Sequence, residues 1–198
     1  MLSNFEKVTR TFHSQVLNRK RLILCCLILF ISFVLPMNVS AATKTLSVPR
    51  VTQAKTKWCW AAASEMVGKY GVSTTRNQWG VVELIWGSAY PNLGGSVNNM
   101  VSGVEYVSEY TKDASSVSYL LSLSTIQSKI DQGKPMIGRL KWDEERGHAI
   151  VFSGYNGSNI RCIDPWEDTS TTYYSYDALL NGSTFLTGTG VISHTVYY

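Results

Sequence analysis

The sequence predicts an α+β domain with a helical first half and an antiparallel β-sheet in its second half. Strong helix formers, with apolar residues three and four positions apart, are concentrated between residues 59 and 104. Short β-prone runs separated by turn residues dominate from residue 106 to the end. Ahead of both lies a basic and then apolar N-terminal segment, which we expect to stand outside the fold.

Residues 1–42 have the organisation of a secretory signal peptide. A basic lead ending in Arg19-Lys20-Arg21 precedes an apolar run from Leu22 to Leu35 that only Ser32 interrupts. The small residues Val39-Ser40-Ala41-Ala42 follow, so cleavage is expected after Ala41 or Ala42. The run is shorter than the roughly twenty residues that an ordinary spanning helix needs. An uncleaved signal anchor is the alternative.

The remaining residues, 43–198, are expected to form one domain of ordinary size without net charge. Of the 18 Lys and Arg, five lie in the signal, and of the 14 Asp and Glu, one does, which leaves 13 of each. The basicity therefore belongs to the signal, and we expect no nucleic-acid partner. The length suffices for a self-contained core. We expect a monomer, secreted or associated with the cell surface, with no membrane contact after cleavage.

The expected helices are placed by their caps and stop signals. The Ala-rich helix from Cys59 to Tyr70 ends at Gly71, a natural stop. Ser96 is expected to cap a shorter helix, and Ser124-Thr-Ile-Gln127 is a capping-box pattern. The full set of expected helices covers residues 59–70, 75–86, 96–104, 124–133 and 176–180.

The expected strands follow the β-prone runs and turn signals. Residues 43–51 form an extended arm around Pro49, which suits a sheet edge. The turn Asn156-Gly157 is expected to join the strands on either side of it as a hairpin. The full set of expected strands covers residues 106–110, 117–123, 136–140, 148–155, 159–163, 171–174 and 191–197.

Cys59 is the candidate nucleophile. It lies between Trp58 and Trp60 at the expected start of a helix, where unpaired N–H groups and the helix dipole favour a thiolate. A thiolate is a working nucleophile, and a thiol is not. The alternative is a small apolar Cys packed beneath two aromatic rings. A disulfide to Cys162 is a further alternative, which only the geometry can decide.

His148 is the candidate base. It follows Gly147 at the start of an apolar strand, whereas His194 is expected to be a solvated strand residue. A hairpin around Asn156-Gly157 pairs residues whose numbers sum to about 313, which places Asp164 across from His148. A carboxylate there would orient the ring and stabilise its charged form. The alternative for His148 is a structural role at a strand end.

The remaining candidates concern the oxyanion and the substrate. Gln53, six residues before Cys59, can supply a side-chain N–H for an oxyanion, beside the backbone N–H of Cys59. Trp58, Trp60 and Trp166 are candidate substrate contacts, and Trp166 could also shield His148 from water. The histidines and acidic residues lack a metal-ligand spacing, so no metal or other cofactor is expected.

Together these residues resemble the papain-like cysteine peptidases. Gln53, five residues and then Cys59-Trp60-Ala61 is similar to the pattern around that family's nucleophile. Gly147-His148-Ala149-Ile150 looks like its histidine strand, and Asp164-Pro165-Trp166 resembles its Asn-x-Trp motif with Asp in place of Asn. The small size and the Trp-Cys-Trp-Ala-Ala run look closest to the compact bacterial C39-like and C70-like branches.

The resemblance implies a papain-like two-part fold, in which the Cys59 helix faces a C-terminal antiparallel sheet across a cleft. It implies a secreted thiol peptidase acting on a protein or peptide. Cys59 would attack the carbonyl, His148 would take and return the proton, Asp164 would orient the ring, and Gln53 would bind the oxyanion. The alternatives are a cell-wall amidase or an acyltransferase with the same triad, and a secreted non-catalytic effector or binding module.

Overall fold

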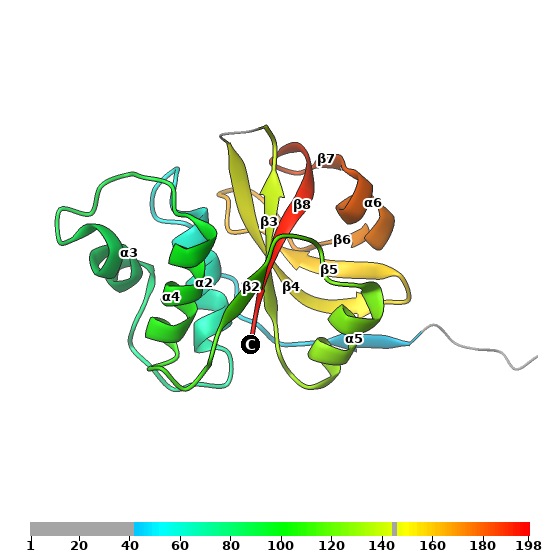
Figure 1. The fold of residues 1–198 in the computed structure, drawn as a ribbon, viewed down its shortest axis with the longest axis horizontal. Helices are drawn as coiled ribbons and strands as arrows, with labels where there is room; N and C mark the ends of the chain where they lie inside the picture. The colour runs from blue at the N-terminus through cyan, green and yellow to red at the C-terminus, as the bar shows by residue number, and fades with distance from the viewer. Residues whose placement is uncertain (1–41, 144–145) are drawn as a thin grey trace, which may run out of the picture. The chain divides into compact units, whose positions relative to one another are not determined.

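The computed structural model of the chain describes residues 42–143 and 146–198 (Figure 1). The expected signal peptide lies outside the described residues except for Ala42, so both the signal and its cleavage stay predictions. The chain from residue 41 to its end forms one compact unit. Within the described part, no helix is long and apolar enough to cross a membrane.

Three helices make up the helical half. They are α2 (Cys59–Lys69), α3 (Gln78–Trp86) and α4 (Val97–Val107). Helix α2 is central, since it contacts both other helices and the sheet strands β3 and β4. Its residues from Trp60 to Gly68 are all buried, and the small side chains of the Ala run let its neighbours approach closely. The helix ends before Gly71, whose φ of 73° suits glycine.

The other half is an antiparallel sheet with two short helices. Its strands run in the order β2-β8-β3-β4-β5-β6, with β1 added to β4 and β7 paired with β8. These elements are β1 (Thr43–Thr45), β2 (Ser115–Val117), α5 (Leu123–Asp131), β3 (Met136–Lys141), β4 (Gly147–Asn156), β5 (Asn159–Ile163), β6 (Thr172–Ser175), α6 (Tyr176–Asn181), β7 (Ser183–Phe185) and β8 (Gly188–Tyr197). The expected α+β fold, with the Cys59 helix facing an antiparallel sheet, is confirmed.

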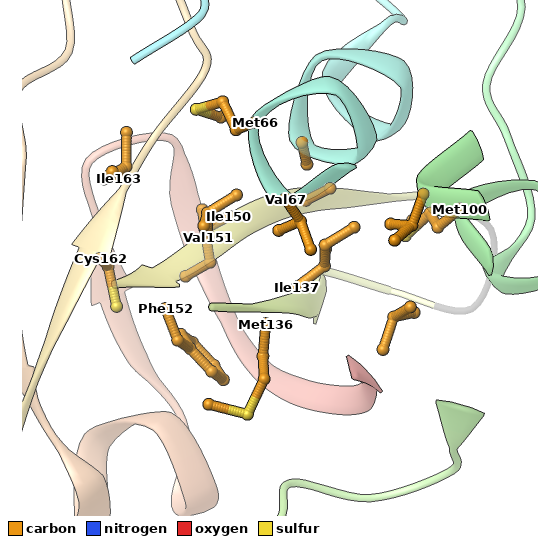
Figure 2. Close-up of a cluster of buried hydrophobic side chains, with 14 of the residues drawn as sticks. Met66, Val67, Met100, Met136, Ile137, Ile150, Val151, Phe152, Cys162 and Ile163 are labelled. Atoms are coloured by element: carbon orange, nitrogen blue, oxygen red, sulfur yellow. The ribbon is translucent and has the colours of Figure 1, made fainter. Parts of the chain in front are cut away.

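The core lies between α2 and the central strands. Val67 of α2 packs towards Ile137 and Val151, on the face of the sheet that α2 covers (Figure 2). Alternate residues of a strand point to opposite faces, so Phe152 and Cys162 point away from α2. The sheet is therefore buried on both faces, which explains why β4 is apolar almost throughout.

The far end of α2 is held by Lys112, which follows α4. Its buried ammonium donates hydrogen bonds to the carbonyls of Val67, Gly68 and Tyr70, at 2.6, 3.1 and 2.6 Å. These carbonyls lie where a helix leaves acceptors unpaired and where its dipole favours a cation. Burial lowers the pKa of Lys112 to about 8. A buried cation thus fastens the end of α2 opposite Cys59.

Two predicted strands are wrong. Residues 106–110 were expected as a strand, but α4 continues to Val107 because Val104 and Val107, three positions apart, both pack in the core. Residues 117–123 were also expected as a strand, but only Ser115–Val117 pairs with β8. Val107, Leu120 and Leu121 are buried in the core without joining a sheet, whereas Tyr110 and Tyr119 are exposed.

Two helix starts also differ from the sequence prediction. Helix α5 is capped by Ser122, whose hydroxyl accepts from the N–H of Thr125, two residues before the expected capping box. The side chain of Gln127 does not close a box but donates to the carbonyl of Gly157 at 2.9 Å. Helix α3 begins at Gln78, after the cap Asn77. Competing Ser, Thr and Asn residues made these starts ambiguous.

The hairpin β4–β5 forms as predicted, but its register differs. Asn156 pairs with Asn159, so the turn is Gly157-Ser158, one residue later than expected. The register then shifts by one at Ser153, between the pairs of Phe152 and Gly154. An extra residue of this kind is a β-bulge, which bends the strand and changes which face the following side chains occupy.

Candidate active site

Cys59 is the first residue of α2, at the edge of the cleft between the two halves. It is partly exposed, and both described cysteines are free, so the Cys59–Cys162 disulfide is excluded. The cap residue Trp58 offers no side-chain hydrogen bond to the helix end. The first N–H groups of α2 therefore remain without a capping side chain, which favours negative charge on a neighbouring sulfur.

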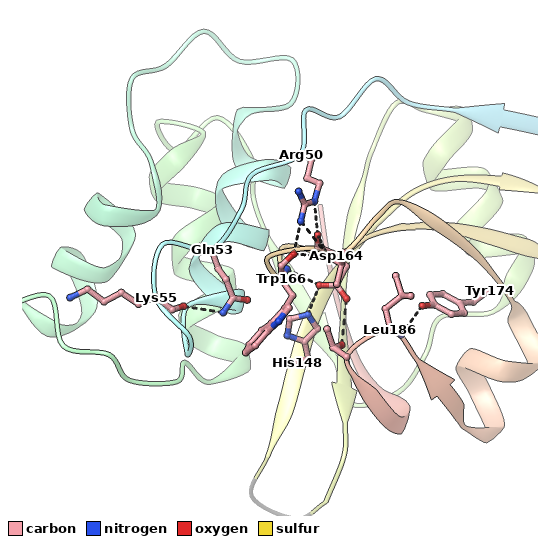
Figure 3. A network of polar contacts seen from close by, with 10 residues as sticks. Arg50, Gln53, Lys55, His148, Asp164, Trp166, Tyr174 and Leu186 are labelled. Carbon is pink, nitrogen blue, oxygen red and sulfur yellow. Dashed lines mark hydrogen bonds and ion pairs between the residues drawn. The ribbon is translucent and has the colours of Figure 1, made fainter.

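His148 and Asp164 are in direct contact. His148 is the second residue of β4, Asp164 follows β5, and both side chains are buried. The ring Nε2 of His148 lies 2.7 Å from Asp164 Oδ1 (Figure 3). Since Asp164 engages Nε2, Nδ1 is the ring nitrogen that remains for Cys59. The structure thus brings together the three residues that the sequence singled out.

The surroundings of His148 favour its charged form. Burial lowers the pKa of the ring, but the hydrogen bond with Asp164 and the hydrogen-bond and charge interactions with Cys59 outweigh it. Together these interactions raise the pKa of His148 to about 9. The charged imidazolium is therefore the favoured form of His148 at neutral pH.

The loop that carries Asp164 is fixed by the N-terminal arm. We call residues 164–169 the Asp loop. Arg50 Nε donates to the carbonyl of Asp164 at 2.9 Å, and its Nη2 donates to the carbonyl of Trp166 (Figure 3). The N–H of Gln53 donates to the carbonyl of Pro165 at 2.8 Å. Sequence reasoning missed Arg50, because nothing local relates it to a loop more than a hundred residues away.

Asp164 itself is held by three donors. Besides the His148 ring, its Oδ1 accepts from the N–H of Trp166 at 2.8 Å. Its Oδ2 accepts from the hydroxyl of Thr187 at 3.4 Å. Several donors around one buried carboxylate satisfy its oxygens and fix its orientation. Thr187 was not predicted from the sequence either, since it lies in the turn between β7 and β8.

Gln53 is buried beside the site. Its Nε2 donates to the carbonyl of Lys55 at 2.9 Å, and its Oε1 has no hydrogen-bond partner among the described residues. An amide nitrogen carries two hydrogens. One hydrogen is engaged with Lys55, and Gln53 itself is not among the residues that line the pocket at Cys59, so its role as oxyanion donor stays a prediction.

The two tryptophans beside Cys59 have different positions. Trp58 is fully buried, donates to the carbonyl of Pro91 at 2.9 Å and packs edge-on against Trp79. It does not line the pocket at Cys59, so the expectation that it contacts the substrate is corrected. Trp60 is also almost buried, but one side of its ring forms a wall of that pocket.

The His148 ring is enclosed by two further tryptophans. The ring of Trp142 is stacked on it, with centroids 5.8 Å apart and 11° between the planes. Trp166 approaches it edge-on, with centroids 6.2 Å apart. These aromatic rings limit the access of water to the His148–Asp164 contact. Trp142 was not singled out from the sequence, because it lies just after a strand without a recognisable motif.

A pocket of about 410 Å³ lies in front of Cys59 and His148. The helical half contributes Trp60, Gly94, Gly95 and Met100, and the sheet half contributes Arg139, Trp142, Gly147 and Trp166. A Cβ atom on Gly95 would lie 2.2 Å from Trp60, so glycine is needed for this close approach. A larger hollow of about 650 Å³ lies along β7 and β8 and contains neither cysteine nor histidine.

The described residues offer no alternative site with metal chemistry. No three His, Cys, Asp or Glu side chains gather within residues 42–143 and 146–198 in a way that could hold a metal ion. Cys162 is buried on the face of the sheet away from α2, and burial raises the pKa of its thiol. His194 lies in β8 with its ring against the Ser193 hydroxyl, outside the pocket.

The sequence matches the Peptidase_C39 like family over residues 45–186, which include all the candidate residues described above. The chain belongs to the C39-like peptidase family. It is accordingly a cysteine-type peptidase. The predicted resemblance to the papain-like cysteine peptidases, in their C39-like branch, is confirmed. No curated protein matches the sequence significantly.

Solved structures show the same fold as this C39-like peptidase. A crystal structure of a C39-like peptidase from Bacillus anthracis superimposes with a TM-score of 0.56 at 12% identity, covering 79% of this chain and 98% of the other. The peptidase domain of Streptococcus ComA, a bifunctional ABC transporter involved in quorum sensing, gives 0.52 at 18% identity and covers 74% and 93%. A double glycine motif protease from an AMS/PCAT transporter, in complex with its leader peptide, gives 0.50 at 15% identity and covers 77% and 91%.

Proposed function

We propose that this C39-like peptidase is a secreted enzyme that hydrolyses peptide bonds through a triad of Cys59, His148 and Asp164. The observation that carries the proposal is the buried 2.7 Å contact between His148 and Asp164, facing Cys59 at the start of α2. A pocket opens in front of the sulfur and the ring, so an acyl group can reach them. These observations support the assignment of Cys59 as nucleophile, His148 as base and Asp164 as orienter.

The thiolate of Cys59 would attack the carbonyl carbon of the scissile bond. The imidazolium of His148 would then donate its Nδ1 proton to the leaving amine, which leaves a thioester on Cys59 and a neutral ring. In the second half, neutral His148 would take a proton from water, which attacks the thioester and releases the acid. Asp164 would hold Nε2 throughout and stabilise the charged ring.

The oxyanion of each tetrahedral intermediate needs hydrogen-bond donors. The backbone N–H of Cys59 lies at the first position of α2, where no intrahelical acceptor is available. Gln53 would supply the second donor through the Nε2 hydrogen that Lys55 does not engage. The carbonyl of Lys55 would fix the plane of the amide before the substrate binds.

The proposed substrates are peptides or proteins. The neighbouring double glycine motif protease is seen in complex with a leader peptide, and we propose peptide binding in the corresponding cleft of this chain. Export rests on the signal-peptide pattern of residues 1–42. We propose a monomeric, secreted or cell-surface protein that no longer contacts the membrane once the signal is cleaved.

The proposal can be tested with the full chain expressed in a bacterial host. Mass spectrometry of the exported protein is expected to find an N-terminus at Ala42 or Thr43. The protein is then incubated with a peptide library, and Cys59→Ala and His148→Ala are expected to abolish cleavage, while Cys162→Ser retains it. A protein that cleaves purified peptidoglycan but no peptide would instead support the amidase alternative.

The thiol can be tested without a known substrate. Iodoacetamide is expected to modify Cys59 near neutral pH much faster than a free thiol, and His148→Ala is expected to remove this excess rate. Buried Cys162 is expected to react only after unfolding, which makes it an internal control. Equal rates for Cys59 in the two proteins would contradict the enzyme reading, because the ion pair is what activates the sulfur.

A further inference from the structure

Arg139 is a cation in the pocket that the proposed mechanism does not use. It lies in β3, two residues after Ile137, which faces α2 (Figure 2). Alternate residues of a strand share a face, so Arg139 points to the same side, towards the cleft. It lines the pocket together with Cys59 and His148.

The guanidinium lies close to the reacting residues. A Cβ atom placed on Gly147, the residue before His148, would lie 3.5 Å from both Cζ and Nη2 of Arg139. The backbone next to the candidate base thus passes beneath the guanidinium. A glycine at this position leaves one face of the guanidinium uncovered by a side chain of β4.

Arg139 is held in place by its neighbours on β8. Its Nη1 donates to the Ser193 hydroxyl at 3.0 Å, and that hydroxyl donates back to the carbonyl of Arg139 at 3.2 Å. His194 also contacts the Ser193 hydroxyl through Nδ1, at 3.0 Å. A guanidinium carries five N–H donors, and this arrangement uses one of them while restricting the side chain.

Within the described part of the chain, the charge of Arg139 has no acidic partner. Among residues 42–143 and 146–198, no carboxylate forms an ion pair with it. Arg146 contrasts with it, because its guanidinium pairs with Asp143 at 2.7 Å. The described residues that line the pocket include Arg139, Arg146 and Lys57 but no Asp or Glu. Among the described residues on the sheet side of the pocket, Arg139 is thus a cation without an acidic partner, whereas Arg146 is paired with Asp143. The helix side includes Trp60, Met100 and two glycines.

We propose that Arg139 selects peptides with a carboxylate close to the scissile bond. The inference rests on the proposed peptidase function and adds a substrate class to it. The carboxylate would be an Asp or Glu side chain or the C-terminal group of a short peptide. It would accept hydrogen bonds from the free guanidinium donors, an arrangement that Arg forms readily with carboxylates.

The first test uses matched peptides that are cleaved by the enzyme and differ only by Glu or Gln at one position near the scissile bond. The Glu peptide is expected to have a kcat/KM roughly tenfold to a hundredfold higher at one position, because hydrogen bonds to charged groups are the strong ones. In Arg139→Gln the ratio is expected to fall to about one, and Arg139→Lys should restore part of it. In Arg139→Glu, peptides with Lys at that position should be favoured.

Arg161→Gln is the matched control. Arg161 also lies on a sheet strand and donates to a serine, Ser153, at 2.7 Å, but it does not line the pocket. The control is expected to keep the wild-type ratio of Glu to Gln peptides. The inference is overturned if the wild-type ratio is near one at every position, or if Arg161→Gln changes it as much as Arg139→Gln does.

A binding test separates this inference from the proposed function. Cys59→Ala protein, with and without Arg139→Gln, is titrated with fluorescent peptide pools that contain Glu or Gln at each position in turn. A preference for Glu that Arg139→Gln removes would support the inference even if no peptide is cleaved. Absence of that preference would overturn it even if cleavage is observed. Amidated and free C-termini in the pools distinguish a terminal carboxylate from a side chain.

Discussion

Replacing Asp164 is the sharpest perturbation of the proposed triad. In Asp164→Asn the side chain keeps one oxygen that can accept the Nε2–H of His148, but it loses its negative charge. In Asp164→Ala both the charge and the acceptor are lost, and the N–H of Trp166 loses its 2.8 Å partner as well. The two variants therefore separate the charge of the carboxylate from its hydrogen bonds.

The expected magnitude follows from the pKa of His148. Its value of about 9, against an ordinary 6.5, corresponds to a preference of about 3 kcal/mol for the charged ring. Burial opposes this preference, and the hydrogen bond with Asp164 is the largest single interaction that favours it. Loss of the carboxylate should therefore lower the pKa of His148, more in Asp164→Ala than in Asp164→Asn, which keeps an acceptor for Nε2–H. In Asp164→Ala we expect kcat/KM to fall about 10²- to 10⁴-fold, the usual range for losing a general acid–base function.

The assay is the pH dependence of kcat/KM and of Cys59 alkylation. In the wild type the charged ring is expected to persist up to about pH 9, so activity should fall on the alkaline side near that pH. In Asp164→Asn the ring loses its proton at lower pH, so the alkaline limb should move to lower pH. The control is Glu167→Gln, which removes one negative charge from an exposed position in the Asp loop.

Two results would refute this reasoning. One is an alkaline limb that stays at the same pH in Asp164→Asn, because the carboxylate charge would then not set the pKa of His148. The other is an equal shift in Glu167→Gln, because any nearby negative charge would then be sufficient. Nearly unchanged activity in Asp164→Ala would remove Asp164 from the triad altogether.

Three further predictions concern the framework of the site. Gly95→Ala should lower the free energy of unfolding in urea by about 1–3 kcal/mol, since its Cβ would lie 2.2 Å from Trp60. Gly94→Ala is the control and should be near neutral, because no atom lies within 4 Å of a Cβ at that position. Arg50→Met should lower kcat/KM about tenfold and also lower the Tm, since two carbonyls of the Asp loop lose a charged donor. We call these two contacts of Arg50 the clamp between the N-terminal arm and the Asp loop; unchanged kcat/KM and Tm in Arg50→Met would contradict its importance. The raised pKa of His148 should contribute stability that is full below pH 6.5 and lost as pH rises through about 9. Urea unfolding between these limits should therefore show a smaller pH effect in His148→Gln than in the wild type.

The sequence predicted much of the site because its motifs are local. The start of α2 at Cys59, the bounds of β5 and the hairpin between β4 and β5 follow from helix formers, β-prone runs and turn residues, and the structure agrees with them. Residues fixed by distant contacts were not predictable in this way. Arg50, Trp142 and Thr187 act through loops that approach the site only after folding.

The contact of His148 with Asp164 was predicted by an incomplete argument. Next to the turn, Asn156 pairs with Asn159. If this register continued without a bulge, Asp164 would lie opposite Val151, which is three residues from His148 and points to the other face of β4. The extra residue Ser153 shifts the pairing by one, so that Asp164 comes level with Ile150, two residues from His148 and on the same face. Neither the position of the turn nor the bulge was predicted. His148 and Asp164 are nevertheless in contact, because side chains on one face of neighbouring strands reach their diagonal neighbours.

The clamp between the N-terminal arm and the Asp loop affects when the site can form. Arg50 and its acceptors at Asp164 and Trp166 are 114 and 116 positions apart in the chain. During synthesis from the N-terminus, Arg50 and Gln53 have no such partners until the Asp loop has been made. The helix with Cys59 can form early, but the arranged triad cannot. A triad arranged in this way therefore requires the chain at least as far as the Asp loop, and a shorter N-terminal fragment is expected to lack proteolytic activity.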